Sequence, residues 1–206
     1  MHNMKNPLRV LIISILILNF SCSTEFSTPE LQNNFSKEQI DELQKITEFF
    51  KNQICKNEKS DFKSCFSKIL PDLLEYGYLP IFDNINFDKQ KELYKSISNS
   101  TFEEIWTFGK ATYPDTGKEL KSMGSTYNGK YQKFIIELGK NNTEIKKYAE
   151  LLVGGGDFEP MGLLEQWIYL NPADFDLDNP NIQLLIAVHY LSHNDQNKRT
   201  DKWDSK

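Results

Sequence analysis

Histidine and cysteine, the side chains that most often supply catalytic bases, nucleophiles and metal ligands, are scarce: the 206 residues contain three of each. No Gly-x-Ser-x-Gly nucleophile elbow occurs. The glycines at 154–156 lack the Lys-Ser or Lys-Thr pair of a phosphate-binding loop, and Asp157 and Glu159 beside them would repel phosphate. These absences argue against the common hydrolase and nucleotide-binding classes.

A surplus of basic residues is also missing, because 24 lysines and arginines face 29 aspartates and glutamates, for a net charge of −5. Nucleic-acid binding depends on clustered Lys and Arg that neutralise phosphates. We therefore expect no nucleic-acid partner. Aromatic residues make up 13% of the chain, which supplies apolar area for the core of one globular domain.

No apolar run reaches the roughly 20 residues that span a bilayer. The run over residues 8–20 is interrupted by Arg9, Ser14 and Asn19, and the residues before it include a lysine and no acidic residue. A short basic region followed by a short apolar core is typical of a secretory signal peptide.

The end of this run, Ser21-Cys22, resembles the signal of bacterial lipoproteins, although Asn19 stands where those signals usually have Leu. The resemblance implies cleavage before Cys22, attachment of palmitate or a similar lipid to this cysteine, and anchoring at the cell envelope. Ser23 in place of Asp implies transfer to an outer membrane. An ordinary cleaved signal peptide and an uncleaved anchor are the alternatives.

Cleavage before Cys22 would divide the chain into a signal peptide (1–21), a polar tether (22–35), a helical domain (36–194) and a polar tail (195–206). The net charge would fall to −7, because the signal holds two basic residues and no acidic one. Cys55 and Cys65 would remain as an even pair in an exported protein, which predicts a disulfide between them.

Apolar residues recur at spacings of three and four through most of residues 36–193, which predicts an all-α domain of stacked helical hairpins. Ser36 and Gln39 have the spacing of a capping box at the start of the first helix. One predicted helix runs from Thr101 to the turn at Pro114. Segments 160–170 and 180–193 are apolar nearly all round and are predicted to be central, buried helices.

His189 and His193 are the strongest candidates for metal ligands. Four residues apart on a helix, they share a face and could hold zinc together. Tyr190 stands where a zinc peptidase would have its catalytic glutamate, so hydrolysis by that mechanism is not expected. The competing interpretation makes His189 a hydrogen-bonded core residue and places His193 near a helix C-terminus, where its charge is favourable.

Asp174, Asp176 and Asp178 alternate as the first ligands of a calcium loop do, but Asn179 and Leu185 replace its glycine and closing glutamate, which rules out an EF-hand. A non-standard calcium site and a solvated loop that caps the next helix are both open. Glu165 interrupts an apolar segment, and an exposed edge is favoured over burial.

Two functions fit these features. The favoured hypothesis is a non-catalytic binding module held at the envelope by lipid on Cys22, with another envelope protein or a small apolar ligand as its partner. The alternative is a metal-dependent enzyme or metal-binding protein that uses His189 and His193 with Asp174 or Asp176, and zinc or calcium as its only cofactor.

Overall fold

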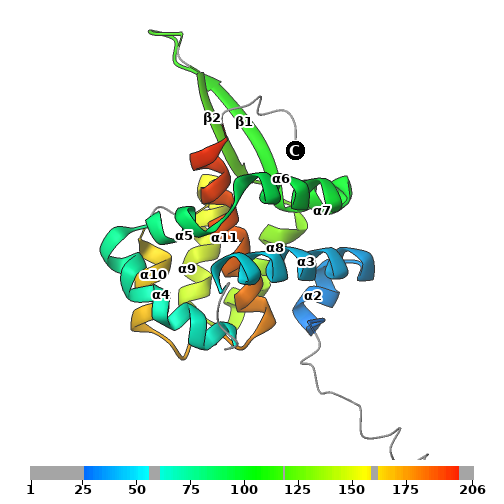
Figure 1. Ribbon diagram of the computed structural model, residues 1–206. Coiled ribbons are helices and arrows are strands. Elements are labelled where there is room, and N and C mark those ends of the chain that lie inside the picture. The colour runs from blue at the N-terminus through cyan, green and yellow to red at the C-terminus, as the bar shows by residue number, and fades with distance from the viewer. Residues whose placement is uncertain (1–25, 56–60, 118, 159–161, 200–206) are drawn as a thin grey trace, which may run out of the picture.

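The computed structural model describes residues 26–55, 61–117, 119–158 and 162–199 (Figure 1). Helices predominate, as the predicted all-α class requires, and the one sheet in these ranges, which that prediction did not include, has two strands. No helix in these ranges is long and apolar enough to cross a membrane. The elements are α2 (Pro29–Asn34), α3 (Lys37–Ile54), α4 (Phe62–Tyr76), α5 (Leu79–Asn84), α6 (Phe87–Ser96), α7 (Asn99–Ile105), β1 (Trp106–Thr112), β2 (Glu119–Ser125), α8 (Lys130–Leu138), the short 3₁₀ helix η1 (Gly139–Asn141), α9 (Thr143–Gly155), α10 (Leu163–Leu170) and α11 (Pro180–Lys198).

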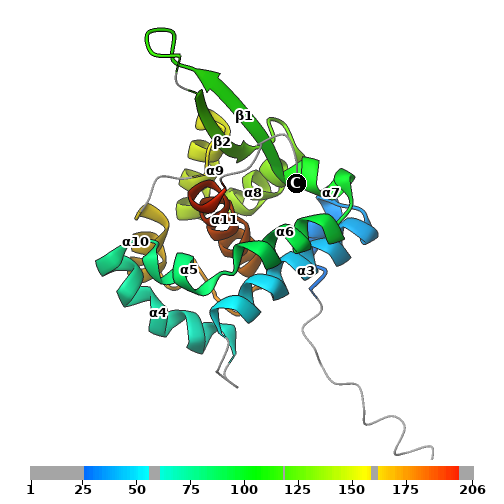
Figure 2. The same ribbon diagram turned by 45° about the horizontal axis from the view of Figure 1, so that its top comes forward.

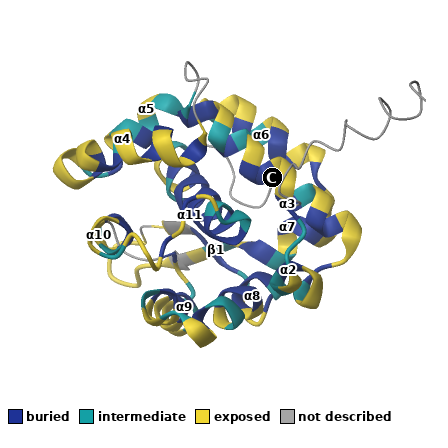
Figure 3. Cartoon of the chain, turned by 90° about the horizontal axis from the view of Figure 1, so that it is seen from below, coloured by how far each residue is buried: buried dark blue, intermediate teal, exposed yellow. Residues whose placement is uncertain are grey.

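Helix α11 forms the centre of the molecule, as its all-round apolar sequence predicts. Every residue from Leu184 to Ser192 is buried, and the other helices surround it with their exposed sides outward (Figure 3). Pro180 occupies the first turn, and the Asn179 side chain accepts a hydrogen bond from the backbone N–H of Asn181 at 2.9 Å. A helix buried on all sides fixes the positions of the elements packed around it.

The β-hairpin corrects one sequence prediction, because a helix was expected to continue from Thr101 to Pro114. Instead α7 ends at Ile105, and β1 pairs antiparallel with β2 from Trp106↔Ser125 to Thr112↔Glu119. Trp106 is buried and donates from Nε1 to the Ser192 hydroxyl at 2.8 Å. The hairpin extends beyond the helices as an arm (Figures 1 and 2).

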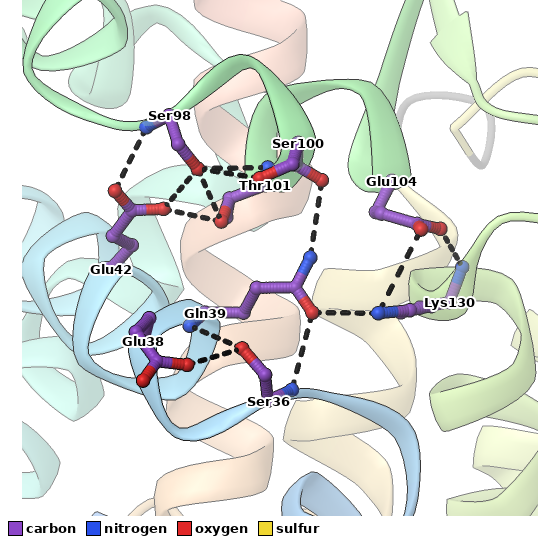
Figure 4. A network of polar contacts seen from close by, with 9 residues as sticks. All are labelled: Ser36, Glu38, Gln39, Glu42, Ser98, Ser100, Thr101, Glu104 and Lys130. Carbon is purple, nitrogen blue, oxygen red and sulfur yellow. Dashed lines mark hydrogen bonds and ion pairs between the residues drawn. The ribbon is translucent and has the colours of Figure 1, made fainter.

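Polar contacts hold the helices that flank this arm (Figure 4). Glu42 of α3 accepts hydrogen bonds from the backbone N–H and the hydroxyl of Ser98 at the start of α7, at 2.8 and 2.7 Å. Lys130 of α8 donates from Nζ to Gln39 of α3 at 2.7 Å and from its backbone N–H to Glu104 of α7 at 2.8 Å. Helices α7 and α8 are therefore both fastened to α3, which sets the direction of the arm.

The predicted tether over residues 22–35 is wrong for its second half. Residues 29–34 form α2, which begins at Pro29 after the Thr28 side chain caps its N-terminus. Leu31 is fully buried, and Phe26 and Phe35 belong to the core. The apolar side chains among these polar residues therefore belong to the packed core, which includes part of the predicted tether. Residues 22–25 lie outside the described ranges.

The predicted polar tail from 195 onward is also wrong in its first part. Helix α11 continues to Lys198, and Asp195 and Arg199 form a bidentate ion pair with both N···O distances at 2.7 Å. Their side chains are 0% and 1% exposed. The two charges are buried because each neutralises the other. Residues 200–206 and the predicted signal peptide (1–21) lie outside the described ranges.

Helices α3 and α4 meet at the cysteine pair. The sulfur atoms of Cys55 and Cys65 lie 1.90 Å apart with their Cα atoms at 5.9 Å, so the predicted pair is at disulfide distance. The capping box of Ser36 and Gln39 is present at the other end of α3. Helix α4 continues through Pro71 and ends at Tyr76, and Gly77, which follows it, has a φ of +63°.

Candidate functional site

The two candidate histidines lie together on α11, with ring centroids 4.7 Å apart. His189 is fully buried, and its Nε2 and Nδ1 lie 3.0 and 3.2 Å from the hydroxyl groups of Tyr78 and Tyr148. A neutral imidazole matches two hydroxyl groups, because one ring nitrogen donates and the other accepts. Of the two interpretations of His189, the structure therefore agrees with the hydrogen-bonded core residue.

Burial also sets the charge state of this cluster. It lowers the pKa of His189 well below its ordinary value, and the neighbouring His193 lowers it further. His193 is partly exposed and packs on the Tyr78 ring at 4.6 Å between centroids. Burial therefore favours the neutral form of His189.

The aspartates predicted to assist the histidines lie elsewhere. Asp176 and Asp178 pair with Lys63 of α4 at 3.7 and 2.8 Å, and the Asp174 carbonyl accepts a hydrogen bond from Asn142 at 2.6 Å. Among the described residues, no three His, Cys, Asp or Glu side chains gather as a possible metal site. The structure thus brings His189 and His193 together without joining Asp174 or Asp176 to them.

Glu165 is buried, which contradicts the exposed edge favoured from the sequence. Its Oε1 accepts a hydrogen bond from the Tyr190 hydroxyl at 2.8 Å, and its Oε2 is buried with no hydrogen-bond partner among the described residues. Burial raises the pKa of this carboxyl group. The Tyr190 ring stacks on Phe50 at 5.8 Å, so Glu165 and His189 both belong to one aromatic core around α11.

Hollows on the surface of the described residues include two whose lining contains neither His189 nor Glu165. The first, the α8–α9 groove, has a volume of about 570 Å³ and a mainly apolar lining formed by Ile136, Gly139, Lys140, Lys146, Ala149, Glu150, Val153 and Gly154. The second, the α2–α3 hollow, has a volume of about 530 Å³ and is lined by Phe26, Ser27, Gln32, Phe35, Lys37, Ile40, Asp41 and Gln44.

Large apolar side chains are exposed on three neighbouring helices, α4, α5 and α10, which lie together at one side of the molecule (Figures 1 and 2). We call this surface the apolar flank. Its residues are Leu74, Tyr76, Leu79, Leu163, Tyr169 and Leu170. Their exposed fractions range from 36% to 68%, with Leu170 the highest. Large apolar side chains that stay exposed on neighbouring helices make these helices the candidate binding surface of the described residues.

The apolar flank was missed because the segment 160–170 was predicted to be a central, buried helix. Helix α10 has only eight residues, and only Leu164, Glu165 and Ile168 of it are buried. Its apolar residues therefore supply both a packed side and an exposed side. The sequence did indicate that this helix is short, because Gly162 precedes it and Asn171-Pro172 follow it. A helix this short is less easily surrounded by other helices.

Comparisons of the chain with family models, with curated proteins and with solved structures give no match.

Proposed function

We propose that the protein is a lipid-anchored, non-catalytic binding protein of the bacterial cell envelope whose partner is another envelope protein. The observation that carries this proposal is the apolar flank. Tyr169 and Leu170 remain 58% and 68% exposed although the same helix buries Leu164 completely. A partner that covers these side chains would remove their apolar area from water, which is the main driving force for association.

The localisation of the protein is part of the same proposal. The Ser21-Cys22 pattern supports lipidation at Cys22 and residence at the outer membrane, and a cysteine pair at disulfide distance suits an oxidising compartment. The buried positions of His189 and Glu165 agree with a non-catalytic role, because both groups are held by tyrosine hydroxyls within the core.

Capture from the native envelope tests the apolar flank. We expect the double variant Tyr169→Glu, Leu170→Glu to lose a partner that the wild-type protein retains, because two carboxylates would have to be desolvated in the interface. Tyr127→Glu is the matched control, since Tyr127 is 75% exposed and lies between β2 and α8, away from the flank. An identical set of captured proteins for wild type and double variant would refute this binding surface.

Labelling with a radioactive fatty acid tests the anchor separately. The wild-type precursor should incorporate the label, and Cys22→Ala should not incorporate it. Cys55 and Cys65 serve as internal controls, because a disulfide-bonded cysteine offers no thiol for acylation. Equal labelling of wild type and Cys22→Ala would exclude Cys22 as the lipid site.

A small apolar ligand is a second candidate partner, and the α8–α9 groove is the observation that favours it. The groove has a volume in the range of ligand pockets, and Ile136, Ala149 and Val153 supply apolar lining. Replacement of Ala149 by Trp would fill it. If purified protein carries a lipid or other apolar molecule, mass spectrometry of extracts should show that molecule in wild type and not in this variant.

A further inference from the structure

The proposed lipid site lies close in sequence to the packed core, since only residues 23–25 separate Cys22 from the buried Phe26. From this we infer that the end of the domain formed by α2 and the first turn of α3 lies against the phospholipid surface, with the β-hairpin directed away from it. The inference depends on the proposed lipidation of Cys22. It adds the orientation of the protein and a membrane-contacting face.

Helix α2 is firmly attached to the domain. The Thr28 hydroxyl donates to the Asn181 side chain at 2.6 Å, and Asn181 donates to Glu30 at 3.0 Å, which joins both ends of the first turn of α2 to α11. Asn33 and Asn34 each donate to Glu137 of α8 at 2.7 Å. Release of α2 to lengthen the link would break these contacts and expose buried apolar side chains.

The length of the link decides the orientation. The four steps from Cys22 to Phe26 extend at most about 14 Å, at the maximum rise of an extended chain. A domain of this size has a radius of gyration of about 16 Å, which corresponds to a diameter of roughly 40 Å. A tether over residues 22–35 would have reached about 50 Å and would have allowed any face to approach the bilayer. The shorter link does not allow this.

The β-hairpin arm lies at the end of the domain opposite to α2. In Figure 1 the hairpin extends from the top of the helical body, and α2 lies at its lower edge. Strands of seven residues extend about 23 Å, so the turn of the hairpin is carried further outward. The turn is therefore the part of the described chain that a soluble partner would meet first.

Among the described residues of α2 and the first turn of α3, the membrane-contacting face has no basic cluster. Its exposed charged side chains include one basic residue, Lys37, and two acidic residues, Glu38 and Asp41. Attraction to anionic lipids therefore contributes little, and the lipid on Cys22 has to hold the face in place. The expected partner surface is a zwitterionic bilayer, and the contact should not depend on salt concentration.

Site-specific quenching tests this orientation in the full lipidated protein. A fluorophore is attached to Lys37→Cys on the proposed face or to Asp115→Cys in the hairpin turn; both positions are exposed. Each labelled protein is bound to phosphatidylcholine vesicles that contain a lipid with a quencher on its headgroup. We expect strong loss of fluorescence for Lys37→Cys and none for Asp115→Cys.

A variant with a spacer gives the matched control. Twenty Gly and Ser residues inserted between residues 25 and 26 add a root-mean-square reach of about 25 Å, which should make the two quenching values approach each other. Quenching at Asp115→Cys that equals or exceeds quenching at Lys37→Cys in the protein without the spacer would overturn the orientation. Vesicle flotation is measured on the same samples, and absence of flotation would instead refute the lipid anchor.

Discussion

The buried ion pair of Asp195 and Arg199 allows the sharpest test of the structure. The Arg199→Ala variant leaves the Asp195 carboxylate buried without its partner, which costs about 3–5 kcal/mol in comparable pairs. The guanidinium also lies 4.9 Å from the Phe108 ring centroid and 5.5 Å from that of Phe87, and loss of these buried cation–π contacts adds about 1–2 kcal/mol. We therefore expect a total loss of about 4–7 kcal/mol.

Urea unfolding followed by circular dichroism measures this loss. Domains of this kind are stable by about 5–15 kcal/mol, so the variant should lose at least a quarter of its free energy of unfolding. With a slope of about 2 kcal/mol per M, the midpoint should fall by about 2 M or more. A shift that corresponds to less than 1 kcal/mol would show that Arg199 does not neutralise Asp195 in the core.

Two further variants separate burial from charge. Lys51 and Glu48 form a surface ion pair in which their side chains are 25% and 47% exposed. Lys51→Ala removes this pair and should change the free energy of unfolding by less than about 0.5 kcal/mol. The double variant Asp195→Leu, Arg199→Met removes both buried charges together. It should recover most of the stability lost in Arg199→Ala, because no unpaired charge remains in the core.

Stability should also depend on pH through two buried groups and on a close backbone approach at Gly124. Because the pKa of His189 is lowered in the folded state, the unfolded state gains a proton first as pH falls below about 6.5. Stability then declines by up to about 1.4 kcal/mol per pH unit, and urea titrations of His189→Gln should lack this decline. The raised pKa of Glu165 acts in the opposite sense, so stability declines as pH rises above about 4.5, and Glu165→Gln should remove that slope in the same titrations. A Cβ at Gly124 would lie 2.7 Å from the Gly156 carbonyl oxygen, so Gly124→Ala should lower the thermal midpoint by several degrees, whereas Gly154→Ala, with open space around it, should not lower it.

The sequence predicted the helical body well because its signals are local. Capping at Ser36, the stop at Gly77 and the spacing of Cys55 and Cys65 each depend on neighbouring residues. The same kind of signal was available for α2, since Thr28-Pro29 is a typical N-cap followed by proline in the first turn. Its polar composition concealed the buried Leu31.

The remaining differences arise from contacts between distant residues. Trp106 lies at a helical spacing from the residues before it, and its position in a strand depends on pairing with β2 and on Ser192. Glu165 is buried because Tyr190 is opposite it. The periodicity of apolar residues reports only local structure and gives no information about contacts between distant residues. It therefore could not predict the hairpin or the polar groups buried in the core.

The base of the hairpin has an evolutionary consequence. The backbone N–H of Thr126 donates to the Ile105 carbonyl at 3.1 Å, so the chain leaves and rejoins the helical body at one place. Trp106 and Met123 are buried just beyond this point, whereas the turn is exposed. Insertions, deletions and substitutions in the outer half of the arm would therefore leave the helices in place, and selection could diversify the arm while the core stays constant.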